Sequence, residues 1–243
     1  MKKATRDELK AVNTRFERKF PLDFRDLGIM LARVRQTCLR DPEFPVGQVN
    51  SLYFDTYDLE QYHRSDNGEY RKDKVRLRWY GDHLPAGGEV PVFLEVKHRR
   101  GFAGSKRRSR LMIPVEKLAM EKLNEGILTR VELMEELGRL GYFSDKPLRP
   151  VIYICYQRQR FYEILTNTRI SHDVDIQGTV IAPDLLPGQP LIRLPGGVLE
   201  IKGPTMEIPV SLRQRLVPDI RWSRFSKYGL LLDAHFNSVT RTI

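Results

Sequence analysis

Cysteine is scarce in this chain, and its two copies, Cys38 and Cys155, are too few for a disulfide framework or a cysteine metal site. Cys155 lies in an apolar run, VIYIC, and we predict that both cysteines are ordinary core residues. The five histidines are scattered without the spacing of metal ligands, so we expect them to be structural or to lie on the surface.

Long hydrophobic runs are also missing. No stretch approaches the roughly 18 to 20 apolar residues that a membrane-spanning helix needs. The first residues, MKKATRDELKAV, include no apolar segment of the kind found in signal peptides. Internal repeats and low-complexity linkers are not found. We therefore expect a cytoplasmic protein with no transmembrane segment of its own.

Basic residues are in excess, since 41 Lys and Arg against 31 Asp and Glu give a formal charge of +10. This excess indicates an anionic partner, and composition alone leaves nucleic acid, a membrane surface and phosphate all open. The chain has 243 residues, of which 41% are hydrophobic and 30% charged. It can therefore bury the core of one large domain or two small ones.

Residue periodicity predicts both helices and strands. Apolar residues at helical spacing predict a helix over 23–39, helices over 114–140 that meet near 124–126, and a closing helix over 226–236. Alternation predicts strands over 49–56, 74–80, 92–99, 151–161, 168–175 and 198–202, with turn-rich connections over 82–91 and 101–109. We expect a single α+β domain over 1–243, with a helical insertion at about 114–142.

Charged side chains in these strands share one face, because residues i and i+2 of a strand point the same way. In residues 74–80 the polar side chains alternate with Val75, Leu77 and Trp79. The same design recurs in five further segments. The shared polar faces carry Lys74, Arg76, Arg78 and Tyr80; Phe93, Glu95, Lys97 and Arg99; Glu200 and Lys202; Arg15, Glu17 and Lys19; Tyr156, Arg158 and Arg160; and Arg169, Ser171, Asp173 and Asp175.

Two arrangements account for such strands. In an ordinary amphipathic sheet the charged faces would lie in water. Lysine and glutamate are poor strand formers, however, and here they occupy strand centres in several segments. If the strands form a barrel with helices packed outside, the charged faces line a central channel. Such a channel must be hydrated or filled by an oppositely charged ligand.

Phosphate fits this lining better than a carboxylate does. The planar guanidinium groups of Arg76 and Arg78 suit bidentate phosphate contacts, and four lysines add point charges: Lys19, Lys97, Lys202 and Lys227. Carboxylates among these cations repel phosphate unless a divalent metal, Mg²⁺ or Mn²⁺, is shared between them. The carboxylates are Glu17, Glu95, Glu200 and Asp173. The pattern predicts a tunnel that holds a chain of phosphates with one or more metal ions.

The motifs on these faces occur in a recognisable order. They are FERKF (16–20), VRLRWY (75–80), FLEVKHRRG (93–101) followed by Lys106, YQRQRF (156–161), RISHDVD (169–175), VLEIK (198–202) and FSKYG (225–229). In order and approximate spacing, the chain resembles the VTC domain, which is the catalytic domain of the vacuolar transporter chaperone complex. That family is a branch of the triphosphate tunnel metalloenzymes, in the CYTH-like superfamily. The resemblance covers nearly the whole chain.

The resemblance implies a closed, eight-stranded antiparallel β-barrel with helices packed outside and a C-terminal helix. It also implies a polyphosphate polymerase, which transfers the γ-phosphate of ATP or another nucleoside triphosphate to a growing inorganic polyphosphate chain with Mn²⁺ or Mg²⁺. Two alternatives stay open on the same scaffold. One is a hydrolase of triphosphates or polyphosphate, and the other is a non-catalytic polyphosphate-binding module.

Site residues follow from the same resemblance and from the strand faces. The residues expected to carry catalysis are Arg76, Arg78, Lys97, Arg158, Lys202 and Lys227. Those expected to bind substrate are Lys19, Lys74, Tyr80, Lys106, Arg169, Ser226 and Tyr228. The expected metal ligand is Glu200, with Glu17 and Glu95 as partners. Lys106 belongs to a basic cluster that resembles a solvated loop, from which it could reach a tunnel entrance.

Nucleic acid is not an expected partner. The chain has no helix-turn-helix, zinc or aromatic-rich RNA-binding signature beside its basic cluster. A duplex also cannot enter a channel eight strands wide, whereas a narrow chain of phosphates can. A membrane partner that exports the product stays possible.

Overall fold

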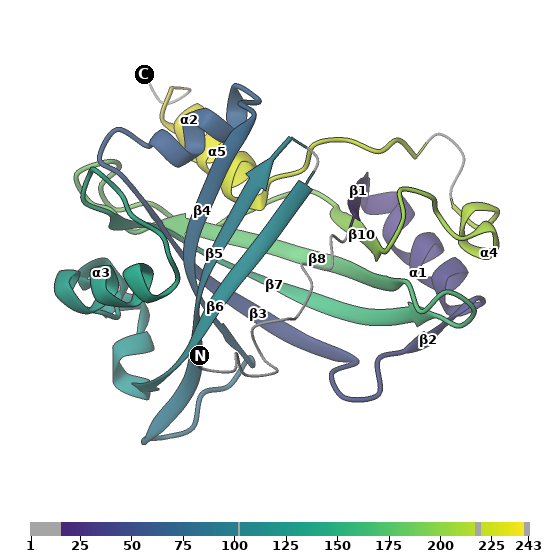
Figure 1. The fold of residues 1–243 in the computed structure, drawn as a ribbon, viewed down its shortest axis with the longest axis horizontal. Helices are drawn as coiled ribbons and strands as arrows, with labels where there is room; N and C mark the ends of the chain where they lie inside the picture. The colour runs from purple at the N-terminus through teal and green to yellow at the C-terminus, as the bar shows by residue number, and fades with distance from the viewer. Residues whose placement is uncertain (1–15, 102, 217–219, 241–243) are drawn as a thin grey trace, which may run out of the picture.

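The computed structural model describes residues 16–101, 103–216 and 220–240. In chain order the elements are β1 (Phe16–Leu22), η1 (Phe24–Asp26), α1 (Leu27–Arg35), β2 (Cys38–Arg40), β3 (Val46–Asp55), α2 (Glu60–Asp66), β4 (Arg71–Tyr80), β5 (Glu89–Arg100), β6 (Ala103–Pro114), η2 (Val115–Leu118), η3 (Met120–Glu125), α3 (Arg130–Arg139), β7 (Arg149–Glu163), β8 (Arg169–Val180), β9 (Ile192–Arg193), β10 (Gly197–Gly203), α4 (Val210–Arg213) and α5 (Lys227–Thr240) (Figure 1).

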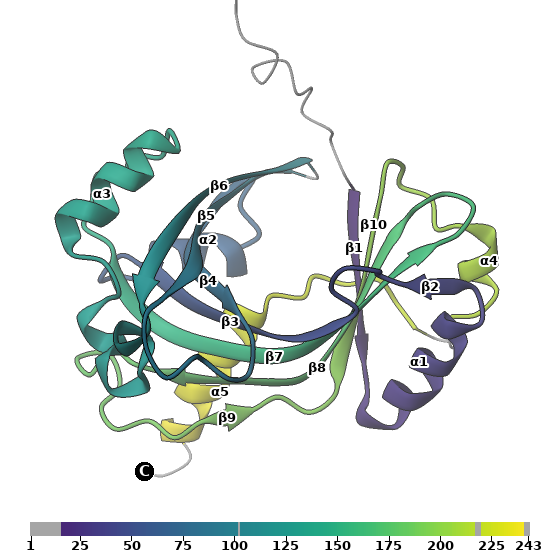
Figure 2. The same cartoon turned by 90° about the horizontal axis from the view of Figure 1, so that it is seen from below.

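One ten-stranded sheet organises the molecule. Eight strands follow the order β1-β10-β8-β7-β3-β4-β5-β6, while β2 pairs with β7 and β9 with β8. The pairings are antiparallel, and the sheet curls into a trough with β6 on one wall and β1 on the other (Figure 2). Among the described residues, no backbone pairing joins β1 to β6. The predicted closure of the barrel is therefore not confirmed.

Side chains and the segment before α5 connect the two walls instead. The Nζ atom of Lys97 on β5 lies 2.9 Å from Oε2 of Glu17 on β1. The backbone N–H of Ser223 donates to the carbonyl oxygen of Lys19, on the edge of β1 that does not pair with β10. Contacts thus link the two walls although the hydrogen-bonded sheet is open.

Two apolar clusters cover the convex face of the sheet. On one side, η2, η3 and α3 pack over β3 to β6, where Leu77 and Leu94 are fully buried and Leu133 of α3 nearly so. On the other side, α1 and α4 pack over β1, β10 and β8, with Met30 and Leu212 fully buried. Because the apolar half of each strand is used outside, the polar half faces inward.

The C-terminal helix is confirmed, and it packs against the concave side of the sheet. Tyr228, at the start of α5, stacks on Tyr53 with ring centroids 5.1 Å apart. Tyr53 lies on the face of β3 that contacts Arg76. The helix continues over Ile152 and Ile154, which share a strand face with Tyr156 and Arg158 further along β7. The start of α5 therefore forms part of the wall at one end of the concave side.

Two local predictions are wrong. Residues 101–109 were expected to be a turn-rich connection, yet most of them belong to β6, which pairs with β5 in the register Lys97 to Lys106. The turn is limited to the region of Gly101, whose φ of 58° suits glycine. The helix predicted over 23–39 stops at Arg35, because residues 38–40 pair with 161–163 as β2.

The helices predicted over 114–140 are confirmed, although 3₁₀ turns make up the first half of this segment. Thr129 and Glu132 form a reciprocal capping box at the start of α3. None of the described helices is long and apolar enough to cross a membrane. That the chain is a single domain over 1–243 stays a prediction.

Candidate functional site

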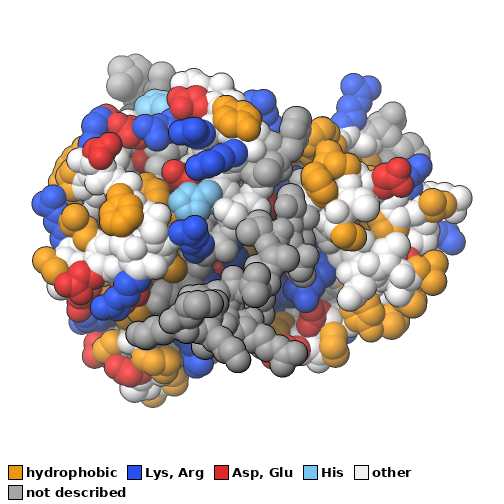
Figure 3. Space-filling view, in the orientation of Figure 1, with side chains coloured by type: hydrophobic (Ala, Val, Ile, Leu, Met, Phe, Trp, Pro, Cys, Tyr) orange, Lys and Arg blue, Asp and Glu red, His pale blue; other side chains and the backbone are white. Residues whose placement is uncertain are grey.

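A cavity of about 750 Å³ occupies the concave side of the sheet. Among the described residues, eleven lysines and arginines line it against five acidic side chains. On the face seen in Figure 3, by contrast, basic side chains are dispersed among acidic and apolar ones where side chains are described. Much of the positive charge that suggests an anionic partner therefore faces this cavity.

Most of the predicted site residues meet in this cavity. Twelve of them line it: Glu17, Lys19, Lys74, Arg76, Arg78, Lys97, Arg158, Glu200, Lys202, Ser226, Lys227 and Tyr228. They come from β1, β4, β5, β7, β10, and the start of α5 with the residue before it. These segments lie far apart in the chain, and the antiparallel pairing brings them together.

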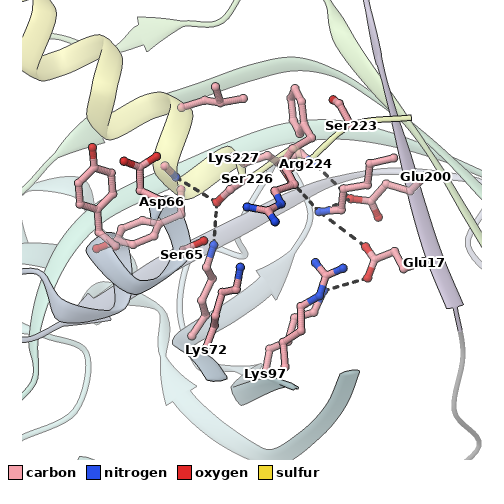
Figure 4. A pocket seen from close by; sticks show the side chains of 18 of the residues that line it. Glu17, Ser65, Asp66, Lys72, Lys97, Glu200, Ser223, Arg224, Ser226 and Lys227 are labelled. Atoms are coloured by element: carbon pink, nitrogen blue, oxygen red, sulfur yellow. Dashed lines mark hydrogen bonds and ion pairs between the residues drawn. The ribbon is translucent and has the colours of Figure 1, made fainter. Parts of the chain in front are cut away.

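Pairing of β1 with β10 interleaves acids and bases. Glu17 is opposite Lys202, and Lys19 is opposite Glu200. The distances between the carboxylate oxygens of Glu17 and Glu200 and the Nζ atoms of Lys19 and Lys202 are 3.1 to 3.7 Å. Lys97 joins the group through Glu17. The side chains of Glu17, Lys97 and Glu200 point into a common space (Figure 4).

A second cluster lies where β7, β8 and α5 meet. The guanidinium of Arg158 binds Asp173 through two hydrogen bonds of 2.6 and 2.7 Å, and it also lies 3.2 Å from Glu200. Lys227 donates to Asp173 over 2.6 Å. Asp173 is fully buried, so it fixes both cations in place without lining the cavity itself.

The third cluster lies on β4. Arg76 donates twice to Glu95 and once to the phenol oxygen of Tyr53. Arg78 donates to Ser51 and to the phenol oxygen of Tyr156. Hydroxyl groups thus orient both guanidiniums, and they do so without adding negative charge.

The carboxylates stay ionised in these clusters. Burial alone would raise the pKa of Glu200, but Lys202, Lys227 and Lys19 outweigh it and hold that pKa well below its usual range. The same balance, with Lys202 and Lys97, holds the pKa of Glu17 well below its usual range. Both groups are therefore anions at neutral pH.

Lys74 differs from the other cations. Burial lowers its pKa to about 7, with further lowering by Lys19 and Lys97. Its Nζ donates to the hydroxyl of Ser226 over 2.7 Å. In the part of the chain that the structure describes, no carboxylate pairs with it. A bound anion would supply the missing negative charge.

Comparison with known proteins decides the family. Residues 5–234 match the VTC domain. The chain belongs to the VTC domain family. It is 27% identical over 231 residues to vacuolar transporter chaperone complex subunit 4 of Trypanosoma cruzi (strain CL Brener), in an alignment covering 76% of this chain and 29% of that protein. The domain thus spans less than a third of that relative's length.

Two solved structures resemble this VTC domain at low identity. A candidate adenylate cyclase from Bacillus halodurans is 14% identical, with a TM-score of 0.45, over 94% of this chain and 89% of its own. A candidate adenylyl cyclase from Hippeastrum, described as having a dominant triphosphatase activity, is 14% identical with a TM-score of 0.46, over 90% of this chain and 96% of its own.

Carboxylates in the VTC domain cavity fit a divalent metal only together with a ligand. In the described residues, no group of three or more His, Cys, Asp or Glu side chains could hold an ion by itself. Mg²⁺ is commonly bound by one or two carboxylates plus substrate phosphates. Glu17 and Glu200 provide such a pair, because both are ionised and both face the cavity.

Four predicted site residues do not line the cavity: Glu95, Tyr80, Lys106 and Arg169. Glu95 is 1% exposed, and its two oxygens are taken by Arg76 and Lys106. It therefore suits the positioning of these cations better than metal binding. Tyr80 is the last residue of β4 and Arg169 is the first residue of β8, and both side chains are exposed.

Several lining or orienting residues were missed as site residues. Ser51 and Tyr53 alternate on β3, so the strand-face argument could have found them. Ser65 and Asp66, at the end of α2, also line the cavity. No sequence signal marks them, because a short helix that folds over a strand end has no recognisable spacing.

Proposed function

We propose that this VTC domain transfers the γ-phosphate of ATP to an inorganic polyphosphate chain inside the cavity. The observation that carries the proposal is the excess of buried cations over carboxylates on one concave face. Burying like charges is costly unless an anion neutralises them. A linear chain of phosphates matches a row of cations that follows several strands. The family and the chaperone subunit that the chain resembles support a polyphosphate substrate.

Phosphoryl transfer needs positioning and neutralisation of charge more than covalent help. Arg76 and Arg158 are held rigidly by Glu95 and Asp173, so their free N–H groups can meet the phosphate oxygens of a bound chain. Lys202 and Lys227 would neutralise charge that develops on the transferred group. The acceptor is a terminal phosphate, which is already ionised, so no general base is required for it.

A divalent cation, Mn²⁺ or Mg²⁺, fits the proposal as cofactor. Glu200 would hold it together with Glu17. When bound, the ion would supply Lewis-acid neutralisation of the negative charge of the phosphates. Lys19 and Lys202, which flank both carboxylates, would keep them in place.

Hydrolysis of triphosphates or polyphosphate is the second candidate. The lining of the cavity favours it as well, because the same cations would orient and neutralise the phosphates of a chain that is hydrolysed. The two reactions differ only in whether water or a phosphate chain occupies the acceptor position. A binding module without turnover is the remaining alternative.

Incubation of the purified protein with ATP and Mn²⁺, followed by electrophoresis with polyphosphate staining, separates these candidates. We expect ladders of long polyphosphate. Orthophosphate without ladders would contradict polymerisation and support hydrolysis, and binding of ATP without any product would support the binding module. The double variant Arg76→Gln/Arg158→Gln is the negative control, since it removes both oriented guanidiniums.

We also propose that the domain works in the cytoplasm and delivers its product to a membrane-bound partner. The relative's name describes a subunit of a complex. Fractionation of cells that express the tagged chain, with detergent-free co-purification of membrane proteins, tests this. Recovery of the chain in the membrane fraction without any co-purifying membrane protein would contradict the proposal.

A further inference from the structure

Two arginines and two aromatic rings form a continuous group at one end of the concave face. The guanidinium of Arg108 on β6 lies 5.0 Å from the ring centroid of Phe93, and that of Arg160 on β7 lies 5.8 Å from the ring of Tyr80. The two rings are 6.0 Å apart and steeply inclined. We call these four residues the arginine end. It extends from β6 across β5, β4 and β3 to β7.

The arginine end continues the rows of cavity side chains. Tyr80 lies two residues beyond Arg78 on β4, and Arg160 lies two residues beyond Arg158 on β7. Because every second residue of a strand shares a face, each pair points the same way, with a spacing of about 7 Å. Arg78 and Arg158 line the cavity. A chain of phosphates bound to them can therefore extend to the arginine end.

Positive charge at this end is not neutralised by the protein. In the cavity, Arg76 and Arg158 each bind a buried carboxylate. Neither Arg108 nor Arg160 forms an ion pair with any described residue. Burial and then the neighbouring Arg158 lower the pKa of Arg160. The ring faces, and for Arg160 also the carbonyl oxygen of Phe44, hold the guanidiniums in place without a negative charge, so their positive charge is available to an anion.

The opposite end of the cavity has mixed chemistry. It includes Ser65 and Asp66 from α2 and Lys72 at the start of β4 (Figure 4). Glu69, the exposed ring of Tyr70, Arg99 and Arg224 also line it. We call this the helix end. Carboxylates can accept hydrogen bonds from ribose hydroxyls, a serine hydroxyl can donate to them or accept from them, and an exposed ring can stack on a base. The two carboxylates offset most of the charge of Lys72, Arg99 and Arg224, so this end attracts a phosphate chain less strongly than the arginine end does.

We propose that the tunnel has a direction: the arginine end binds the distal phosphates of the polyphosphate chain, and the nucleoside of the triphosphate lies at the helix end. This inference rests on the proposed function and adds to it a separate subsite for the chain. A triphosphate that occupies the cavity centre does not reach Arg108 and Arg160, whereas a long chain does.

The test compares ligands of different length on two double variants. Arg108→Gln/Arg160→Gln removes both guanidiniums of the arginine end. Arg107→Gln/Arg193→Gln is the matched control with the same loss of charge, because Arg107 points to the outer face and Arg193 lies exposed on β9. Binding of long-chain polyphosphate and of tripolyphosphate is measured by calorimetry at several salt concentrations, and melting temperatures verify folding.

We expect the arginine-end variant to bind long polyphosphate on the order of tenfold more weakly, with a log–log salt slope smaller by roughly 1.4 for two lost phosphate contacts. Its affinity for tripolyphosphate, and both affinities of the control, should change by less than about twofold. Equal losses for both ligands, or no selective loss for the long chain, would overturn the inference while leaving the proposed function intact. Failure of the unmodified protein to bind either ligand would overturn both.

Discussion

At the scale of single residues, Glu200 is the most connected carboxylate of the cavity. It lies within 3.5 Å of four cationic groups, those of Lys19, Arg158, Lys202 and Lys227. A carboxylate with so many partners must serve charge balance as well as any metal. The two roles can be separated by a substitution that keeps its shape.

Glu200→Gln should reduce turnover of ATP on the order of 10²-fold or more, because the proposed metal loses its main ligand. Tripolyphosphate binding without metal should be retained or strengthened, since one negative charge leaves the cavity. Product gels and calorimetry in the presence and absence of Mn²⁺ measure the two effects. Glu116→Gln, at an exposed position, is the control. Unchanged turnover of ATP in Glu200→Gln would contradict the assignment of Glu200 as a metal ligand.

Lys74 predicts a pH dependence of phosphate binding. Its pKa of about 7 means that the free protein loses this positive charge above neutrality. A bound phosphate raises the pKa, so binding takes up a proton, and affinity falls as pH rises from about 7. The fall is at most about tenfold per pH unit. In Lys74→Met the part of the pH dependence that comes from Lys74 should disappear. The phosphate ligand also titrates, but it does so equally with both proteins, so the difference between their pH profiles reports on Lys74. Parallel pH profiles of the two proteins would contradict the prediction.

At the scale of elements, the junction of β3, α2 and α5 determines the helix end of the cavity. Asp55, at the end of β3, accepts the backbone N–H groups of Thr56, Gln61 and Tyr62 and the hydroxyl of Tyr228. It is fully buried. One carboxylate thus ties a short helix and the start of α5 to the sheet.

Asp55→Asn should therefore destabilise the fold by about 3 kcal/mol, since an amide nitrogen faces donors that it cannot accept from. Urea unfolding measures the loss as a lower midpoint. Asp58→Asn, which affects an exposed pair with Lys146, should cost less than about 1 kcal/mol. Equal losses of unfolding free energy for the two substitutions would contradict the role of Asp55 in stabilising this junction.

At this scale the sequence predicted most elements correctly. Alternation over 74–80 and 92–99 identified β4 and β5, because burial of one face leaves a period of two in the chain. The same rule failed for β6, whose Lys106, Arg107 and Arg108 are polar on both faces. An edge strand with one face on the cavity and the other partly in water has no apolar alternation to detect. The polar composition of residues 101–109 therefore led to the prediction of a turn-rich connection instead of a strand.

At the scale of the whole molecule, surplus positive charge on the concave face opposes folding until an anion binds. Tripolyphosphate should stabilise the protein by about 2.7 kcal/mol at a concentration one hundred times its Kd. Thermal melting with increasing tripolyphosphate measures this, and added salt should weaken it. A neutral sugar at the same concentration is the control. An unchanged melting temperature would contradict an anion-binding cavity.

The sequence by itself determined which side chains share a strand face, because the two-residue period is a property of the extended backbone alone. That was enough to predict cations such as Arg76 and Arg158 on an inward face, and the order of motifs was enough to recognise the family. Only the tertiary structure decided which faces meet. It turned Glu95 toward Arg76 and Lys106, left the sheet open between β1 and β6, and placed α5 over the concave side. Register and packing between distant strands depend on the whole set of contacts, which no local pattern contains.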